Sequence, residues 1–418
     1  MAFMTSLSEK LGVEPQNVRL LNTIYFTFFA SGMISTLLGA ILPNLKSAYN
    51  ISYILTGSVY SFHQLGNLIA VILAGILPYI IGRKKTTIIM FSGLVIGILI
   101  ITFTGTPVML LLAFTLTGIG RGTASNITNV VVASTTKNKT AGLNILHASF
   151  AVGALFSPFI LIFLSSFSPI SGWRFTMWFV AACMITVLIL ITSSSMSNEK
   201  EGKLKQTGFS SAVTPFYRSL SYWLNTAILT FYLCGESANM GWLVTYFKDT
   251  GLMGQTFAQI TSSLMWIMIL CGRLMCASIS GKVNRNKLVL ILAALNTAFF
   301  ILMISTRCMP VIIIGLLGTG FSMSGIYPTT LSTMKPEYNT STIAVGTCMG
   351  IALTGATVMP LIVGTIAEKV TATAVQSGLS QTAAENRGVS SGMGAIAFAL
   401  AVMLILNIVK YLLSRKNH

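Results

Sequence analysis

The sequence contains few charged residues. They make up 8% of its 418 residues, and only nine residues are acidic. A soluble globular protein carries about 25% charged residues, which cover its water-exposed surface. A chain of this length with so little charge is therefore neither an ordinary soluble enzyme nor a disordered polymer.

The motifs of enzyme chemistry are also missing. No phosphate-binding loop and no cluster of metal-ligating residues occurs. The six cysteines lie in apolar segments without metal-site spacing, so we interpret them as small core residues. We expect no enzyme activity, no metal and no cofactor other than a coupling proton.

The net charge of +17 would indicate nucleic acid in a soluble protein. Here it is attributed to the loops of a membrane protein, and no nucleic-acid partner is expected.

Apolar runs dominate the chain, since hydrophobic residues account for 54% of it. A membrane-spanning helix needs about 20 such residues. Backbone groups in lipid must be satisfied within the segment, so each run is predicted to be a helix. The sequence thus predicts an all-α membrane protein of twelve transmembrane helices in two pseudo-symmetric six-helix bundles. The expected spans are 20–42, 54–81, 86–105, 108–134, 141–166, 173–194, 222–247, 256–281, 287–306, 309–333, 342–367 and 390–413.

Basic residues predict the orientation. With the N-terminus inside, 18 of the 26 Lys and Arg residues fall in inner segments and 6 in outer ones. Such a bias indicates that both termini are cytoplasmic, and we favour the plasma membrane, here a bacterial inner membrane. The polar, basic stretch in the middle predicts three parts: an N-terminal bundle 1–195, a cytoplasmic linker 196–221 and a C-terminal bundle 222–418. No pattern predicts an oligomer, so a monomer in contact with membrane lipid is expected.

The two halves repeat each other in four pairs of spans, with offsets between 200 and 206 residues. Two parallel six-helix repeats are typical of the major facilitator architecture, in which the substrate binds between the halves. The aligned pairs are Phe28–Gly32 with Phe231–Gly235, Gly66 and Gly75 with Gly272 and Gly281, Gly118–Gly120 with Gly318–Gly320, and Gly153 and Pro158 with Gly355 and Pro360.

Particular motifs carry a family resemblance. The segment from Gly75 to Lys85 resembles the major facilitator loop Gly-x-x-x-Asp-Arg-x-Gly-Arg-Lys-Lys, with Tyr79 in place of the acid. Three further segments resemble the fucose/galactose/glucose–proton symporters: His147 to Pro158, Gly235 to Tyr246, and Ser324 to Thr329. The resemblance implies proton-coupled sugar uptake. The chain departs from it where fucose-type members carry carboxylates, because Gly39 and Thr123 stand at those positions.

Three residues are candidates for proton coupling. Glu236 is the only acid deep in a span, where a charge costs at least about 2.5–3.5 kcal/mol. It either carries a proton or serves as a structural carboxylate. Arg121 lies among glycines that allow helices to approach closely; it would pair with Glu236, bind an anionic substrate or reach the headgroups. His147 would relay protons or hydrogen-bond a neighbouring helix.

A set of polar and aromatic residues within spans is typical of a sugar site. Amides donate to and accept from hydroxyl groups, and aromatic rings offer flat faces to a sugar ring. Helix–helix hydrogen bonding and interfacial anchoring are the alternatives. The candidates are His63, Gln64, Asn67, Asn126, Asn129, Asn239, Trp242, Tyr246, Trp266 and Tyr327. A gating role is predicted for Gly82, Arg83, Lys84, Lys85 and Arg273.

These patterns predict a secondary active transporter that takes up a small-molecule solute, a hexose-like sugar, with protons by alternating access. Two other transport functions remain open. One is a proton-coupled exporter of drug-like or lipid-like compounds, which the 21 Met and 24 Phe residues allow. The other is an organic-anion carrier in which Arg121 and the histidines hold a carboxylate.

Overall fold

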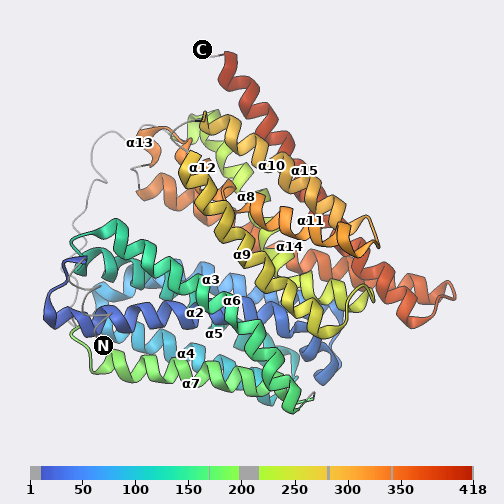
Figure 1. Ribbon diagram of the computed structural model, residues 1–418, viewed down its shortest axis with the longest axis horizontal. Helices are drawn as coiled ribbons and strands as arrows, with labels where there is room; N and C mark the ends of the chain where they lie inside the picture. The colour runs from blue at the N-terminus through green and yellow to red at the C-terminus, as the bar shows by residue number, and fades with distance from the viewer. Residues whose placement is uncertain (1–10, 169, 197–215, 280–282, 340–341, 417–418) are drawn as a thin grey trace. The chain divides into compact units, whose positions relative to one another are not determined.

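The computed structural model describes residues 11–168, 170–196, 216–279, 283–339 and 342–416. In these ranges the long elements are all helices (Figure 1). The first half contains α2 (Pro15–Tyr49), α3 (Tyr53–Ile81), α4 (Arg83–Phe103), α5 (Pro107–Thr135), α6 (Lys139–Phe167) and α7 (Gly172–Thr192). The second contains η1 (Phe216–Arg218), α8 (Leu220–Asp249), α9 (Gln255–Ile279), α10 (Arg285–Ile304), α11 (Met309–Met323), α12 (Ile326–Ser332), α13 (Pro336–Asn339), α14 (Thr342–Gln376) and α15 (Gln381–Lys416).

The lengths and hydropathies of these helices make the chain a multi-pass membrane protein. Within the described residues, eleven helical segments are long and apolar enough to cross a membrane, with α11 and α12 counted as one. The helix α8 is 30 residues long but more polar, because it carries Glu236, Ser237 and Asn239. With α8 as the remaining span, the predicted fold class is confirmed. The sidedness of the termini stays a prediction.

One predicted span is broken. The predicted span 309–333 corresponds to the apolar segment Met309–Ser332, within which α11 ends at Met323 and α12 begins at Ile326. Pro328 explains the break, because proline lacks an amide hydrogen and its ring clashes with the carbonyl four residues earlier, which is that of Ser324. The predicted span is confirmed, and the interruption within it is a feature that the apolar pattern did not predict.

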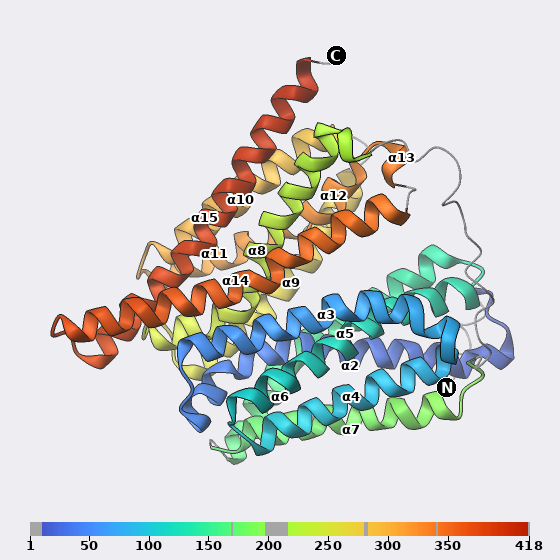
Figure 2. The same cartoon turned by 180° about the vertical axis from the view of Figure 1, so that it is seen from behind.

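The chain contacts define two compact units. Unit 1 comprises residues 1–44 and 62–207, and unit 2 comprises residues 45–61 and 208–418. Within unit 1, α4 packs beside α7, and within unit 2, α14 packs beside α15, as both views show (Figures 1 and 2). Most of the expected linker 196–221 lies outside the described residues, so the three-part division stays a prediction.

Glycine contacts repeat between the units. In unit 1, Gly153 of α6 lies directly against the carbonyl of Phe29 on α2. In unit 2, Gly355 of α14 lies against the carbonyl of Thr230 on α8. A side chain at either glycine would collide with the facing backbone, so only glycine permits this helix spacing.

A second pair of contacts follows the same rule. Gly66 of α3 lies against the carbonyl of Thr115 on α5, and Gly272 of α9 lies against that of Phe321 on α11. Both partners are displaced by the same 206 residues between the units. The repeat seen in the sequence is therefore a repeat of helix packing.

Candidate functional site

The charged interior of unit 1 is built around Arg121 on α5. Its guanidinium Nε donates a hydrogen bond of 3.0 Å to the Ser35 hydroxyl of α2. On the same helix, Gly118 lies against the backbone of His63, and Gly122 lies against Asn67. These glycines bring α3 and α5 together. His63 and Asn67 therefore lie on α3, the helix that packs against α5, and Arg121 lies on α5.

His63 and Arg121 interact with each other. The His63 side chain is 3% exposed, its Nδ1 lies 3.0 Å from the Thr117 hydroxyl, and its ring interacts electrostatically with Arg121. His147 of α6 is exposed, and its ring packs edge-on against Phe28 at 5.4 Å between centroids. Between residues 11 and 196 the only acidic residue is Glu14. The interior of unit 1 therefore has a cationic character that suits an anion.

The predicted amides of unit 1 lie on α3 and α5. Asn126 donates to the carbonyl of Gly122 at 3.1 Å, and Asn129 donates to that of Ser125 at 2.6 Å. Each of these two amides therefore bonds its own helix. Gln64 and Asn67 are half-buried on α3. A substrate role for the four amides stays a prediction.

Glu236 of α8 lies half-buried near tyrosine hydroxyl groups in unit 2. Its carboxylate interacts electrostatically with Tyr232, one turn earlier, and with Tyr327 of α12. The Tyr232 hydroxyl donates to the carbonyl of Met323 at 3.0 Å, and Arg273 of α9 also interacts with Tyr232. An acid among hydroxyl groups and an arginine is well placed to exchange a proton. This role stays a prediction.

Four more candidates lie in unit 2. Trp242 is fully buried and donates to the carbonyl of Pro360 at 3.1 Å, while Tyr246 and Asn239 are each 2% exposed. Both amide atoms of Asn239 lack a hydrogen-bond partner within the described residues. Trp266 is half-buried on α9. The packing gives Trp242 a structural contact, and its binding role stays a prediction.

The predicted gating segment has a defined geometry. Gly82 caps the start of α4 with a φ of 86°, a left-handed conformation that favours glycine. Lys84 donates to the carbonyl of Ser194 at 3.1 Å, and Lys85 is exposed. Arg83 lines a cavity of about 290 Å³ in unit 1 with Asn126.

Unit 2 contains a comparable cavity of about 380 Å³. It is lined by Arg273, Arg285 and the residues at the break between α11 and α12. Arg285 begins α10, as Arg83 begins α4, and the two arginines are 202 residues apart. The gating roles remain predictions, but the arginines occupy equivalent places in the repeat.

Sequence reasoning missed an ionic cluster in unit 2, here named the Lys46 cluster: Lys46, Tyr53, Asp249, Glu368 and Glu385. The Lys46 ammonium lies 3.0 Å from Asp249 and 3.6 Å from Glu385, and it sits 3.7 Å from the centroid of the Tyr53 ring. The Tyr53 hydroxyl donates to Asp249 at 2.8 Å, and its amide donates to Glu368 at 2.7 Å. Three of the nine acids thus hold the segment 45–61 on unit 2. The sequence signal that could have revealed this cluster is that its charged residues lie at or near the ends of predicted spans.

We expect Asp249→Ala to lower the free energy of unfolding by about 1.5–3 kcal/mol, because it removes a charged partner from both Lys46 and Tyr53. Asp249 is only 8% exposed, so water does not replace the lost contact. Unfolding in a denaturing detergent measures the change. Glu14→Gln alters an exposed acid that bonds Gln16 and serves as the control. If Asp249→Ala and Glu14→Gln had the same free energy of unfolding, the cluster would contribute nothing to stability.

Sequence reasoning did not foresee the surroundings of Lys410, which was counted with the inner basic residues although it lies inside the predicted span 390–413. It is 7% exposed on α15, and its ammonium donates to Asn225 at 2.7 Å and to Thr333 at 2.5 Å. The helix continues to Lys416, so residue 410 lies within the packed bundle. The apolar run around Lys410 gave no sign that its ammonium group would be buried.

Asn225→Ala should destabilise the protein more than Lys410→Met, since the first removes one of the two hydrogen-bond acceptors of a buried ammonium group and the second removes the charge itself. We expect about 1.5–3 kcal/mol for Asn225→Ala. The double variant should be more stable than Asn225→Ala alone. Detergent unfolding of the three variants tests this order, with Lys287→Met as an exposed control. A double variant that is less stable than Asn225→Ala would contradict it.

These features define a class, the polytopic transporters built from two repeated helical bundles. Residues 24–352 match the family model described as Major Facilitator Superfamily, and the chain belongs to this family. Members of the family carry small-molecule solutes. The family assignment is therefore confirmed, and the sugar–proton symporter subgroup stays a prediction.

Three known proteins are similar to this chain. A gallate transporter of Pseudomonas putida is 26% identical over 349 residues, which are 73% of this chain and 75% of that protein. A bacterial homologue of the human lysosomal transporter Spinster, inward-facing and occupied, has a TM-score of 0.75 at 14% identity and covers 95% of this chain and 97% of its own. A peptide transporter POT in complex with sulfate has a TM-score of 0.71 at 12% identity, covering 95% and 94%. The two structural similarities show the fold.

Proposed function

We propose that this protein is a secondary transporter that carries a small organic anion by alternating access. The observation that supports this proposal is the position of Arg121, which is held by Ser35 on a helix packed against the one that carries buried His63, inside a unit whose described spans contain no acidic residue after Glu14. The similarity to a gallate transporter adds support, because gallate is a carboxylate.

The guanidinium of Arg121 would bind the substrate carboxylate. An arginine forms two parallel hydrogen bonds to a carboxylate, and a water-poor site strengthens them. The bond from Nε to Ser35 fixes the orientation of the side chain. Because His63 interacts with Arg121, its ring would add a second polar contact at the same site.

Glu236 would couple transport to protons. Protonation cancels a charge inside the membrane, and this changes the balance between outward-open and inward-open states. The Tyr232 hydroxyl would stabilise the ionised form of Glu236 by hydrogen bonding. Uptake of an anion together with a proton is the direction that we propose.

Proton-coupled uptake of a hexose-like sugar is the second candidate. The observation that favours it is the group of amides on the packed pair α3 and α5, namely Gln64, Asn67, Asn126 and Asn129. Amides both donate to and accept from hydroxyl groups. Because two of these four bond their own helix, the anion proposal has the stronger geometric support.

A ligand screen by thermal shift tests the proposal. Aromatic carboxylates including gallate, neutral hexoses and hydrophobic cations are added to the purified protein at acidic and neutral pH. Stabilisation by carboxylates alone, followed by their uptake into proteoliposomes, is the expected result. Stabilisation by one hexose alone would favour the sugar candidate, and stabilisation by cations alone would favour an exporter of drug-like compounds. Either would overturn the anion proposal.

A further inference from the structure

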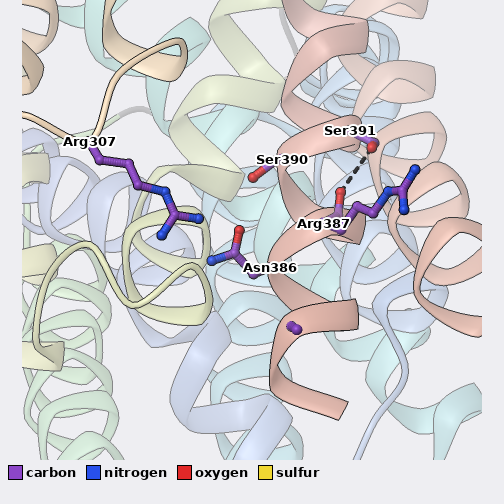
Figure 3. A pocket seen from close by; sticks show the side chains of 6 residues that line it. Arg307, Asn386, Arg387, Ser390 and Ser391 are labelled. Carbon is purple, nitrogen blue, oxygen red and sulfur yellow. Dashed lines mark hydrogen bonds between the residues drawn. The ribbon is translucent and has the colours of Figure 1, made fainter. Parts of the chain in front are cut away.

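A surface cavity of about 650 Å³ lies in unit 2 beside the turn between α10 and α11 (Figure 3). Its lining residues are Arg307, Ala383, Asn386, Arg387, Ser390 and Ser391. In Figure 3 the Arg307 side chain extends from the turn toward Asn386 of α15, and Arg387 extends from the other side of that helix. Asn386 is fixed by a hydrogen bond of 2.8 Å to the carbonyl of Thr250.

The cavity carries uncompensated positive charge. The sequence contains no acidic residue between positions 250 and 336, so none of the helices α9 to α12 supplies a carboxylate. Glu385 is the acid closest to Arg387 in sequence, but its two oxygens are bonded by Gln381 and Tyr53. Within the described ranges, the salt bridges of unit 2 are those of Lys46 and do not include Arg307 or Arg387. An anion is the complementary ligand.

An apolar stripe begins directly beside this cavity on α15. Ser391, Phe398, Ile405 and Leu412 follow one another at intervals of seven residues, so they share one face of the helix. Phe398, Ile405 and Leu412 are 70%, 58% and 54% exposed. In a membrane-spanning helix such a face contacts lipid.

A second exposed stripe lies on α10, which packs against α15. It contains Ile291, Leu295 and Leu302 and leads toward Arg307. Both stripes therefore lead toward the residues of the cationic cavity, Arg307 at one end and Ser391 at the other stripe's start. Seven residues of helix rise about 10 Å, so a lipid with its headgroup level with Ser391 would have its acyl chains beside Phe398.

We propose that this cavity binds the phosphate headgroup of an anionic phospholipid, whose acyl chains lie along the exposed stripes of α10 and α15. Arg307 and Arg387 provide the charge, and the serine hydroxyls and Asn386 provide polar contacts. The combination of a cationic, polar cavity with adjoining apolar helix faces matches both parts of a phospholipid. This site lies in unit 2 and is separate from the Arg121 site.

Native mass spectrometry of the purified full chain tests the proposal. Phosphatidylglycerol and phosphatidylcholine with the same acyl chains are compared on the wild type, on Arg307→Gln/Arg387→Gln and on the control Lys369→Gln, which removes an exposed charge from α14. We expect the wild type to prefer phosphatidylglycerol and the double variant to bind it about 30-fold more weakly, a factor of about five for each lost charge. The control should bind as the wild type does.

Free glycerol phosphate distinguishes a lipid site from a site for small anions. Calorimetric titration should detect no binding of glycerol phosphate at the concentrations at which phosphatidylglycerol binds. Equal binding of the two ligands, lost in the double variant, would identify a small-anion site and overturn the lipid proposal. Unchanged phosphatidylglycerol binding by the double variant would also overturn it. If the wild type bound phosphatidylcholine as tightly as phosphatidylglycerol, the lipid proposal would be overturned as well.

Discussion

Arg121→Gln is expected to reduce organic-anion uptake by about 30-fold or more. Loss of one member of a buried, hydrogen-bonded charge pair costs about 2–5 kcal/mol, and each 1.4 kcal/mol corresponds to about tenfold in affinity. The loss should appear in the apparent affinity for the substrate. Initial rates of uptake into proteoliposomes over a range of substrate concentrations measure it.

Two further variants sharpen this experiment. Arg121→Lys keeps the charge but loses the planar fork that binds a carboxylate through two bonds, so it should show an intermediate defect. Arg19→Gln is the matched control, because Arg19 is also an arginine of unit 1 that donates to a serine hydroxyl, at 3.0 Å, but it is exposed. Normal uptake by Arg121→Gln, at wild-type melting temperature, would show that Arg121 does not bind the anion.

Glu236→Gln is expected to abolish accumulation of substrate against its gradient while substrate exchange continues. A glutamine keeps the shape and polar contacts of the site beside Tyr232 and Tyr327 but cannot take up and release a proton. The carrier could still change its conformation with substrate bound, since that step needs no change in the charge of residue 236.

The two activities are separated in proteoliposomes. An imposed pH gradient drives accumulation, and preloaded unlabelled substrate drives counterflow. Glu337→Gln, which changes an exposed acid of the same unit, is the control. Accumulation by Glu236→Gln in response to the pH gradient would exclude Glu236 as the coupling group. Loss of both activities would assign it a structural role.

The glycine pattern was a strong guide to the fold. Gly153 and Gly355 were aligned from the sequence, and both lie against a facing backbone carbonyl. Glycine is informative because any side chain there would separate the helices, so its position reports a contact directly. The alignment of Gly118 with Gly318 was less successful. In the structure Gly118 lies against the backbone of α3, as Gly320 lies against that of α9, whereas Gly318 lies against α10.

Long-range polar contacts could not be predicted in the same way. Lys46 and Asp249 are 203 residues apart, and Lys410 and Asn225 are 185 residues apart. Each residue has an ordinary place in the sequence, at the end of an apolar run or near a terminus. Its partner depends on which helix ends meet, and no local pattern contains that information.

The sequence by itself determined the membrane class, the positions of the spans and the doubling of the helical bundle. In lipid, each spanning segment must form its backbone hydrogen bonds within itself. This is a local requirement, so an apolar run is enough to predict a helix. It also singled out Arg121 and Glu236, since a charge inside a span is costly and rare. Only the tertiary structure decided that His63 interacts electrostatically with Arg121, that Lys410 is buried and that Arg307 and Arg387 share a cavity. These relations arise from packing between helices distant in sequence, where side chains become neighbours only after the chain has folded.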